Sequence, residues 1–133
     1  MQLKSGKIVT GKNSKLMHAA ASLVINAVKV LAKIPDEILL LSPQIINQIA
    51  ILKEGVLNLE PESLDLEEAL IALSISATAN HTAEIAMKKL AELRGCEMHM
   101  THLPTPGDEV GLKMLGINVT TDGKFSSNNL FVT

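Results

Sequence analysis

The sequence TGKNSKLMHAAASLVINAVKVLAKI, residues 10–34, predicts a turn followed by one long core helix, around which the other elements are arranged. Ser14 is a residue type that caps helix N-termini, and Pro35 disfavours helical geometry just before it. We therefore expect a helix from Lys15 to about Lys33. Its polar residues recur every three or four positions, which places them in one narrow stripe: Lys15, His18, Ser22, Asn26, Lys29 and Lys33. The remaining surface is apolar, which predicts that other elements cover this helix on most sides.

The composition indicates one domain with more apolar surface than it can bury alone. A chain of 133 residues is long enough to form its own core. Its hydrophobic share is 47%, and its mean hydropathy of +0.26 is high for a small domain. We therefore expect part of its surface to be buried in a homo-oligomer or against an N-terminal region that is missing from this chain.

Several classes of protein are excluded by what the sequence lacks. No segment reaches the roughly 18 unbroken apolar residues of a membrane helix, and the start, MQLKSGK, has no apolar signal-peptide core. The single cysteine, Cys96, rules out a disulfide framework, so we expect a cytoplasmic protein with no membrane partner. A net charge of −2, with neither Trp nor Tyr for base stacking, argues against a nucleic-acid partner.

The order of apolar runs and turn residues predicts an α/β fold. The segments that read as strands are Lys7–Thr10, Ile38–Leu41, Cys96–Leu103 and Ile117–Thr121. Helices are predicted over Pro43–Lys53, Leu66–Ala77, from a Thr82 cap to Arg94, and over Asp108–Leu115. This alternation favours a small, mainly parallel sheet of about four strands flanked by helices. We expect residues 1–133 to form a single domain with an irregular tail over 122–133.

The turn before the first helix is a candidate anion site. GKIVTGKN, from Gly6 to Asn13, is one residue short of the phosphate-loop pattern, and it lacks both the preceding strand and the magnesium-binding hydroxyl. A nucleoside-triphosphate loop is therefore not predicted. Backbone N–H groups at a helix N-terminus still attract anions, and the residues available there are Thr10, Gly11, Lys12 and Ser14. The simpler interpretation, a capped turn with solvated lysines, is favoured over an anionic small-molecule partner.

Cys96, His99 and His102 do not have the spacing of a metal site. On a strand, alternate side chains share a face, so Cys96 and His102 would point one way and His99 the other. Zinc ligands instead come in pairs from a tight turn or one helix face. We therefore predict no metal, and we interpret Cys96 as a small buried filler.

The segment after the third predicted strand is a second candidate site. In a parallel sheet, ligands gather at the carboxyl ends of strands, and Thr101–Glu109 lies at such an end. His102 could act there as a general acid or base, with Thr105, Asp108 and Glu109 contacting a ligand. A proline-stiffened turn followed by an acid-capped helix explains every residue except His102, and this interpretation is favoured.

Four stretches together resemble a known family: KSGKIVTGKNS, DLEEALIALSISATAN, ELRGCEMHMTHLPTPGDEVGLKMLGINVT and the closing NNLFVT. Read in this order, they are similar to the C-terminal portion of an uncharacterised bacterial family, domain of unknown function 1846. The resemblance implies a longer protein with an α/β region upstream. Some members carry the label of ATP-dependent peptidase, which no motif in this sequence supports, and the resemblance transfers no catalytic residue or cofactor.

Two hypotheses of function follow. In the first, the chain is a cytoplasmic module for ligand binding and assembly. In the second, it is a small-molecule enzyme in which the turn over residues 11–14 holds an anionic group and His102 is the acid or base.

Overall fold

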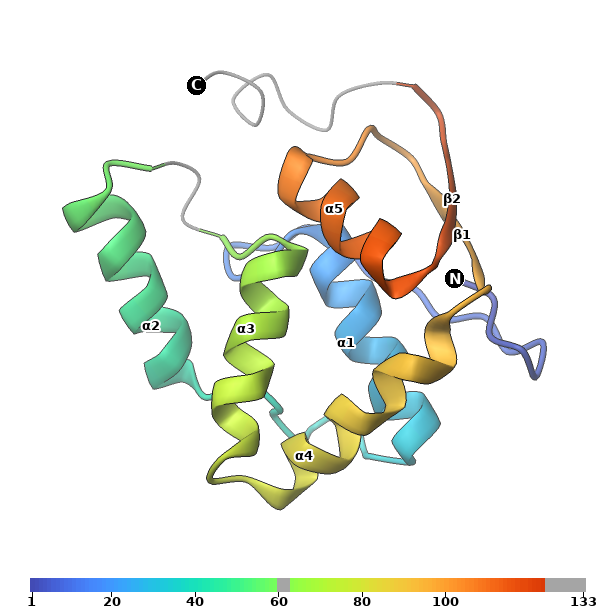
Figure 1. Ribbon diagram of the computed structural model, residues 1–133, viewed down its shortest axis with the longest axis horizontal. Coiled ribbons are helices and arrows are strands. Elements are labelled where there is room, and N and C mark those ends of the chain that lie inside the picture. The colour runs from blue at the N-terminus through green and yellow to red at the C-terminus, as the bar shows by residue number, and fades with distance from the viewer. Residues whose placement is uncertain (60–62, 124–133) are drawn as a thin grey trace.

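The computed structural model describes residues 1–59 and 63–123, which form a mixed α/β domain dominated by helices (Figure 1). Its helices are α1 (Ala19–Ala32), α2 (Pro43–Ile51), α3 (Leu66–Ala77), α4 (His81–Lys88) and α5 (Pro106–Leu115). A π-helical turn, η1 (Leu52–Val56), extends α2, and a 3-10 turn, η2 (Lys89–Leu93), extends α4. The strands are β1 (Glu97–Met100) and β2 (Asn118–Thr121). In the described part of the chain, no helix is both long and apolar enough to cross a membrane.

Helix α1 lies at the centre, as its apolar face predicts. It packs against α3 and α4, and α3 packs in turn against α4 and α5. Val24 and Val28 of α1 have no exposed surface, and they share one core with fully buried leucines of the neighbouring elements, Leu64, Leu66, Leu73 and Leu93. The predicted bounds of α3, Leu66–Ala77, are confirmed, as is the buried position of Cys96.

The sheet is smaller than the sequence predicts. Strands β1 and β2 are parallel, with Met98 paired to Val119, and α5 connects them. The predicted strands at Lys7–Thr10 and Ile38–Leu41 are wrong, so the described residues contain two strands in place of about four. The first segment makes only an isolated antiparallel bridge, from Ile8 to Gln2. The second is an irregular loop in which only Leu40 and Leu41 are buried. An apolar run can bury side chains in the core without pairing its backbone.

Helix α1 begins four residues later than predicted. The Ser14 hydroxyl oxygen accepts hydrogen bonds from the N–H groups of Leu16 and Met17, each at 3.2 Å, so it closes a separate turn. The chain then pairs with Leu64, whose N–H donates to the Leu16 carbonyl and whose carbonyl accepts from the N–H of His18. Contacts with a segment almost fifty residues away therefore override the local capping signal.

The other helix ends differ from the predictions by a few residues. Asn80, and not Thr82, caps α4, and Thr105 caps α5, which starts two residues before Asp108. Ser42 caps α2 as its sequence indicates. The predicted irregular tail, 122–133, lies mostly outside the described residues.

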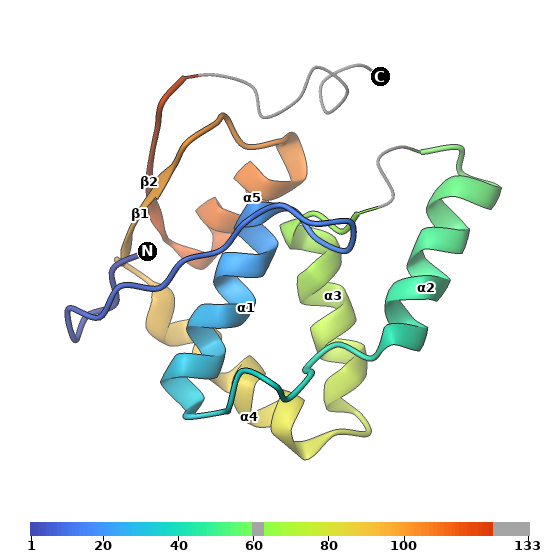
Figure 2. The ribbon, with the colours of Figure 1, turned by 180° about the vertical axis from the view of Figure 1, so that it is seen from behind.

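Gly11 allows the N-terminal segment to cross the side of α1, a crossing visible in Figure 2. A Cβ atom at this position would lie 2.5 Å from the backbone nitrogen of Leu23 and 2.7 Å from its Cα. The backbone of α1 cannot yield cheaply, because this helix is packed in the core. The crossing segment is exposed, but the Asn26 side chain holds it to α1 by donating a hydrogen bond to the Thr10 carbonyl.

Gly11→Ala should lower the free energy of unfolding by about 1–3 kcal/mol, the usual cost of overpacking. Gly55→Ala is the matched control, because a Cβ there meets no atom within 4 Å. Urea unfolding followed by circular dichroism measures both. Equal stability of the two variants would show that the crossing is not as close as described.

Candidate functional site

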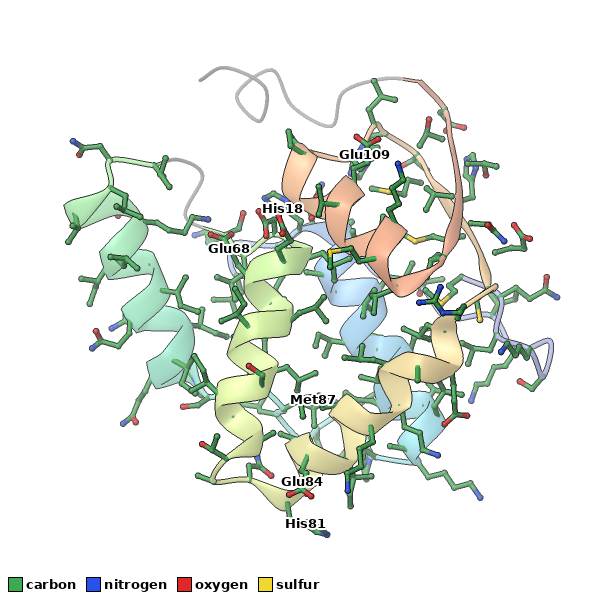
Figure 3. The ribbon with its side chains drawn as sticks, viewed as in Figure 1. His18, Glu68, His81, Glu84, Met87 and Glu109 are labelled. Carbon is green, nitrogen blue, oxygen red and sulfur yellow. The ribbon has the colours of Figure 1, made fainter. Side chains whose placement is uncertain are left out.

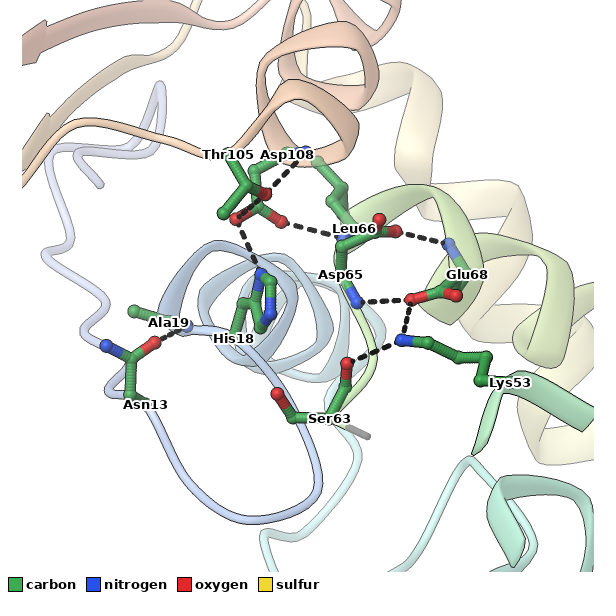
Figure 4. A network of polar contacts seen from close by, with 10 residues as sticks. All are labelled: Asn13, His18, Ala19, Lys53, Ser63, Asp65, Leu66, Glu68, Thr105 and Asp108. Atoms are coloured by element: carbon green, nitrogen blue, oxygen red, sulfur yellow. Dashed lines mark hydrogen bonds and ion pairs between the residues drawn. The ribbon is translucent and has the colours of Figure 1, made fainter. Parts of the chain in front are cut away.

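The starts of three helices meet at the side chain of Asp108, which is only 2% exposed (Figure 4). A carboxylate is only an acceptor, so its Oδ2 atom accepts from His18 Nδ1 at 2.8 Å and from the Thr105 hydroxyl at 2.9 Å. Its Oδ1 atom accepts from the backbone N–H of Leu66 at 2.8 Å. His18 and Thr105 cap α1 and α5, and Leu66 is the first residue of α3. One carboxylate therefore ties together three helices.

The surroundings of Asp108 favour its ionised form. Burial by itself raises the pKa of this carboxyl, but the hydrogen bonds and charge of His18 and the donors of Leu66 and Thr105 outweigh it. The pKa of Asp108 therefore lies below its ordinary value of 3.8. Helix N-termini attract anions, and here the protein supplies that anion from its own chain.

A second group of polar contacts continues from this point along the start of α3. Asp65 and Glu68 form a reciprocal cap, in which each side chain accepts from the backbone N–H of the other at 2.9 Å. Lys53 donates to Glu68 Oε1 at 2.8 Å and to the Ser63 carbonyl at 3.0 Å, so it anchors η1 to α3. Burial, with smaller contributions from the Glu68 and Asp108 carboxylates, raises the pKa of Asp65 above its ordinary value.

His18 is oriented like the histidine of a general-base pair, but its ring is not exposed to a substrate. A histidine whose Nδ1 bonds a buried carboxylate is held as in a general-base pair, leaving Nε2 to take the proton. In His18 the Nε2 atom is itself buried and has no hydrogen-bond partner within residues 1–59 and 63–123. The pair therefore joins α1 to α5 and does not present a base at the surface.

The structure brings together only some of the residues predicted at the late site. Thr105 and Asp108 are in contact, whereas Glu109 is exposed and borders a separate hollow between α5 and β2. Figure 3 shows Glu109 on the outside of α5, apart from His18. His102 is partly buried, and its side chain makes no hydrogen bond or ion pair with any described residue. Its role as acid or base stays a prediction.

The predicted anion turn runs beside α1 from the middle of that helix to its start, where the Asn13 side-chain oxygen accepts from the Ala19 N–H at 2.7 Å. All four of its residues are exposed: Thr10, Gly11, Lys12 and Ser14. The Thr10 carbonyl accepts from the Asn26 side chain, in the middle of α1, at 2.9 Å. Thr10 borders one hollow and Glu109 borders another, and the two hollows share no lining residue. Anion binding at this turn stays a prediction, but the geometry does not join it to the late site.

Sequence reasoning missed the histidine that completes the network. The sequence placed His18 in a narrow stripe of polar residues, and no periodicity indicates a partner 90 residues away. The cap formed by Asp65 and Glu68 is easier to predict from the sequence, because an acidic residue three positions after a capping residue is a recognisable pattern.

The fold and this network define a small, mainly helical α/β module whose helix starts are joined by buried polar contacts. The chain belongs to the family described as domain of unknown function DUF1846, C-terminal, whose model matches residues 1–131. The resemblance in the sequence is therefore confirmed.

Three curated bacterial relatives are considerably longer than this chain. A UPF0371 protein of Clostridium botulinum (strain Eklund 17B / Type B) is 48% identical over 131 residues, which is 98% of this chain and 26% of the relative. UPF0371 proteins of Fusobacterium nucleatum and Clostridioides difficile (strain 630) are each 45% identical, with the same coverage. The chain thus spans about a quarter of the length of these relatives, and their names state no activity.

Asp108→Ala should lower the free energy of unfolding by about 2–5 kcal/mol, because it leaves the Leu66 N–H and His18 Nδ1 buried without an acceptor. Glu109→Ala, one residue away and exposed, should change it by less than about 1 kcal/mol. Chemical denaturation measures both values. A small effect of Asp108→Ala would mean that the carboxylate does not hold the three helices.

The two shifted carboxyl groups should give stability a maximum in mildly acidic solution. Between pH 3.8 and the raised pKa of Asp65, the native state binds more protons than the unfolded state, so stability should rise as pH falls through that window. Asp108 has the opposite sign: its contribution is complete above pH 3.8 and is lost as pH falls through its lowered pKa.

Asp65→Asn should abolish the acid-side rise and keep the loss below pH 3.8, since Asn caps helices as well as Asp does. Urea unfolding at several pH values from 7 to 3 is the measurement, and an unchanged profile in this variant would contradict the assignment.

Proposed function

We propose that this chain is a module for ligand binding and assembly, and that its assembly surface is an exposed apolar segment at the end of α2. The side chains of this segment, the α2–η1 face, are Ile51, Leu52, Val56, Leu57 and Leu59, of which Val56 is 70% exposed. We propose that this face is covered by another part of the same polypeptide, in a protein as long as the relatives. This apolar face is the observation that carries the proposal.

Helix α2 needs a further packing surface. It has nine residues, none of them buried, and it lies at the outer edge of the molecule, where it packs mainly against α3 (Figure 1). A helix of this length is marginal in water by itself and depends on burying an apolar face. A second element placed against its outer side would supply that burial.

The α2–η1 face is held in place by a contact between η1 and the start of α3. Lys53 is buried, and its ion pair with Glu68 fixes η1 to the start of α3. The apolar side chains of the face are each at least 49% exposed, so they are directed away from the core. A preorganised apolar surface of this kind is typical of an interface and unusual on the exposed side of a small domain.

The relatives support a partner from the same polypeptide. About three quarters of each relative lies outside the region that matches this chain. A domain joined covalently to a partner of that size meets it at high effective concentration, so a modest apolar patch is enough for stable packing.

The enzyme hypothesis has no additional support from the contacts described. Catalysis by His102 with an anion at residues 11–14 stays a prediction, as does the cytoplasmic location.

A chimera tests the assembly proposal: this chain replaces the C-terminal quarter of the Clostridium botulinum relative. Val56→Asp should destabilise the chimera by more than about 2 kcal/mol, because it buries an unpaired charge, and should leave the isolated chain almost unchanged. Met114→Asp, at another exposed apolar position on α5, is the matched control and should be tolerated in both. Thermal unfolding and hydrogen exchange over residues 51–59 give the readout.

Equal effects of Val56→Asp in the chimera and in the isolated chain would contradict this proposal. The other possible occupant of the face is a second copy of this chain, and sedimentation of the isolated chain tests it. If the isolated chain self-associates and Val56→Asp abolishes that self-association, the face belongs to the second copy.

A further inference from the structure

A cavity separates α1 from α2 and from the loop that joins them. Its volume is about 520 Å³, within the range of small-molecule sites. Most of its wall is apolar, with Ile25 from α1, Leu40 from the loop and Ile46 from α2. The cavity therefore has the size and lining to take an apolar group.

The charged groups on this wall all have one sign. They are Lys15 and Lys29, and no Asp or Glu within residues 1–59 and 63–123 lines the cavity. An anion is therefore the complementary ligand, and a cation would be repelled by both lysines.

Lys29 is the unusual member of the pair. It is only 7% exposed, and its ammonium donates to the Asp36 carbonyl at 2.6 Å. It forms no ion pair with any residue in the described ranges. An ammonium has three donors, and burying one without an anionic partner is costly. The dipole of α1 favours a lysine in its last turn, but a solvated side chain would satisfy that preference equally well.

We propose that this cavity binds an organic acid with an apolar body, such as a medium-chain alkyl carboxylate. Its carboxylate pairs with the Lys29 ammonium, and its chain lies against Ile25, Leu40 and Ile46. The site is distinct from the predicted anion turn and from the α2–η1 face, so it stands or falls independently of the assembly proposal.

Lys29 also borders a second, more polar hollow with Thr10, Lys33 and Asp36. An anion bound there would need no apolar body, so inorganic phosphate would compete for it. Binding in the cavity therefore requires an apolar body on the ligand, whereas binding in the second hollow does not.

Calorimetric titration of the full chain with decanoate, decanol and inorganic phosphate tests the proposal. Decanoate should bind at least about tenfold more tightly than decanol, the minimum expected of a hydrogen-bonded charge. Methyl NMR signals of Ile25 and Ile46 should shift with decanoate and not with phosphate. Lys29→Met should remove the preference for decanoate, and Lys29→Arg should keep it. Lys33→Met is the matched control, because Lys33 lies outside this cavity and should leave decanoate binding unchanged.

Three results would overturn the proposal. They are the absence of decanoate binding, equal affinity for decanol, and an equal loss of decanoate binding in Lys29→Met and Lys33→Met. Phosphate competing with decanoate would instead assign the ammonium to the second hollow, which also overturns it. Circular dichroism of each variant verifies that it is folded.

Discussion

The buried carboxylate of Asp108 is the constraint on which the arrangement of helices depends. A carboxylate with almost no exposure must have its oxygens bonded, and its donors come from the starts of α1, α3 and α5. These donors lie up to 90 residues from it in sequence. Hydrogen bonds are directional, so the apolar core brings the helices together and this carboxylate determines how their starts are placed.

The positive ends of these helices are compensated by carboxylates of the chain itself. Asp108 and Asp65 provide internal anions at the positive ends of helices, where an external anion would otherwise be favoured. Lys29, near the other end of α1, is buried without an anionic partner among the described residues. The uncompensated group is therefore cationic and lines an apolar cavity, which is why the ligand inferred there is an acid.

The two proposals use different sides of the same weakly packed helix. Helix α2 forms one wall of the cavity with Ile46, and its C-terminal extension carries the exposed apolar face. An element that covered this face would also hold α2 over the cavity. Membership of a family whose members are about four times longer is consistent with such a covering region.

The family, the central helix, the span of α3 and the βαβ order around α5 could be predicted from the residues alone, because these depend on local caps, apolar periodicity and residue order. Three features become visible only in the folded chain: residues 38–41 form a loop, Leu64 pairs with the segment before α1, and His18 contacts Asp108. Each of these is a contact between distant segments. The sequence pattern around a polar residue is the same whether its side chain faces water or a partner 90 residues away. No pattern within one segment could therefore reveal these contacts.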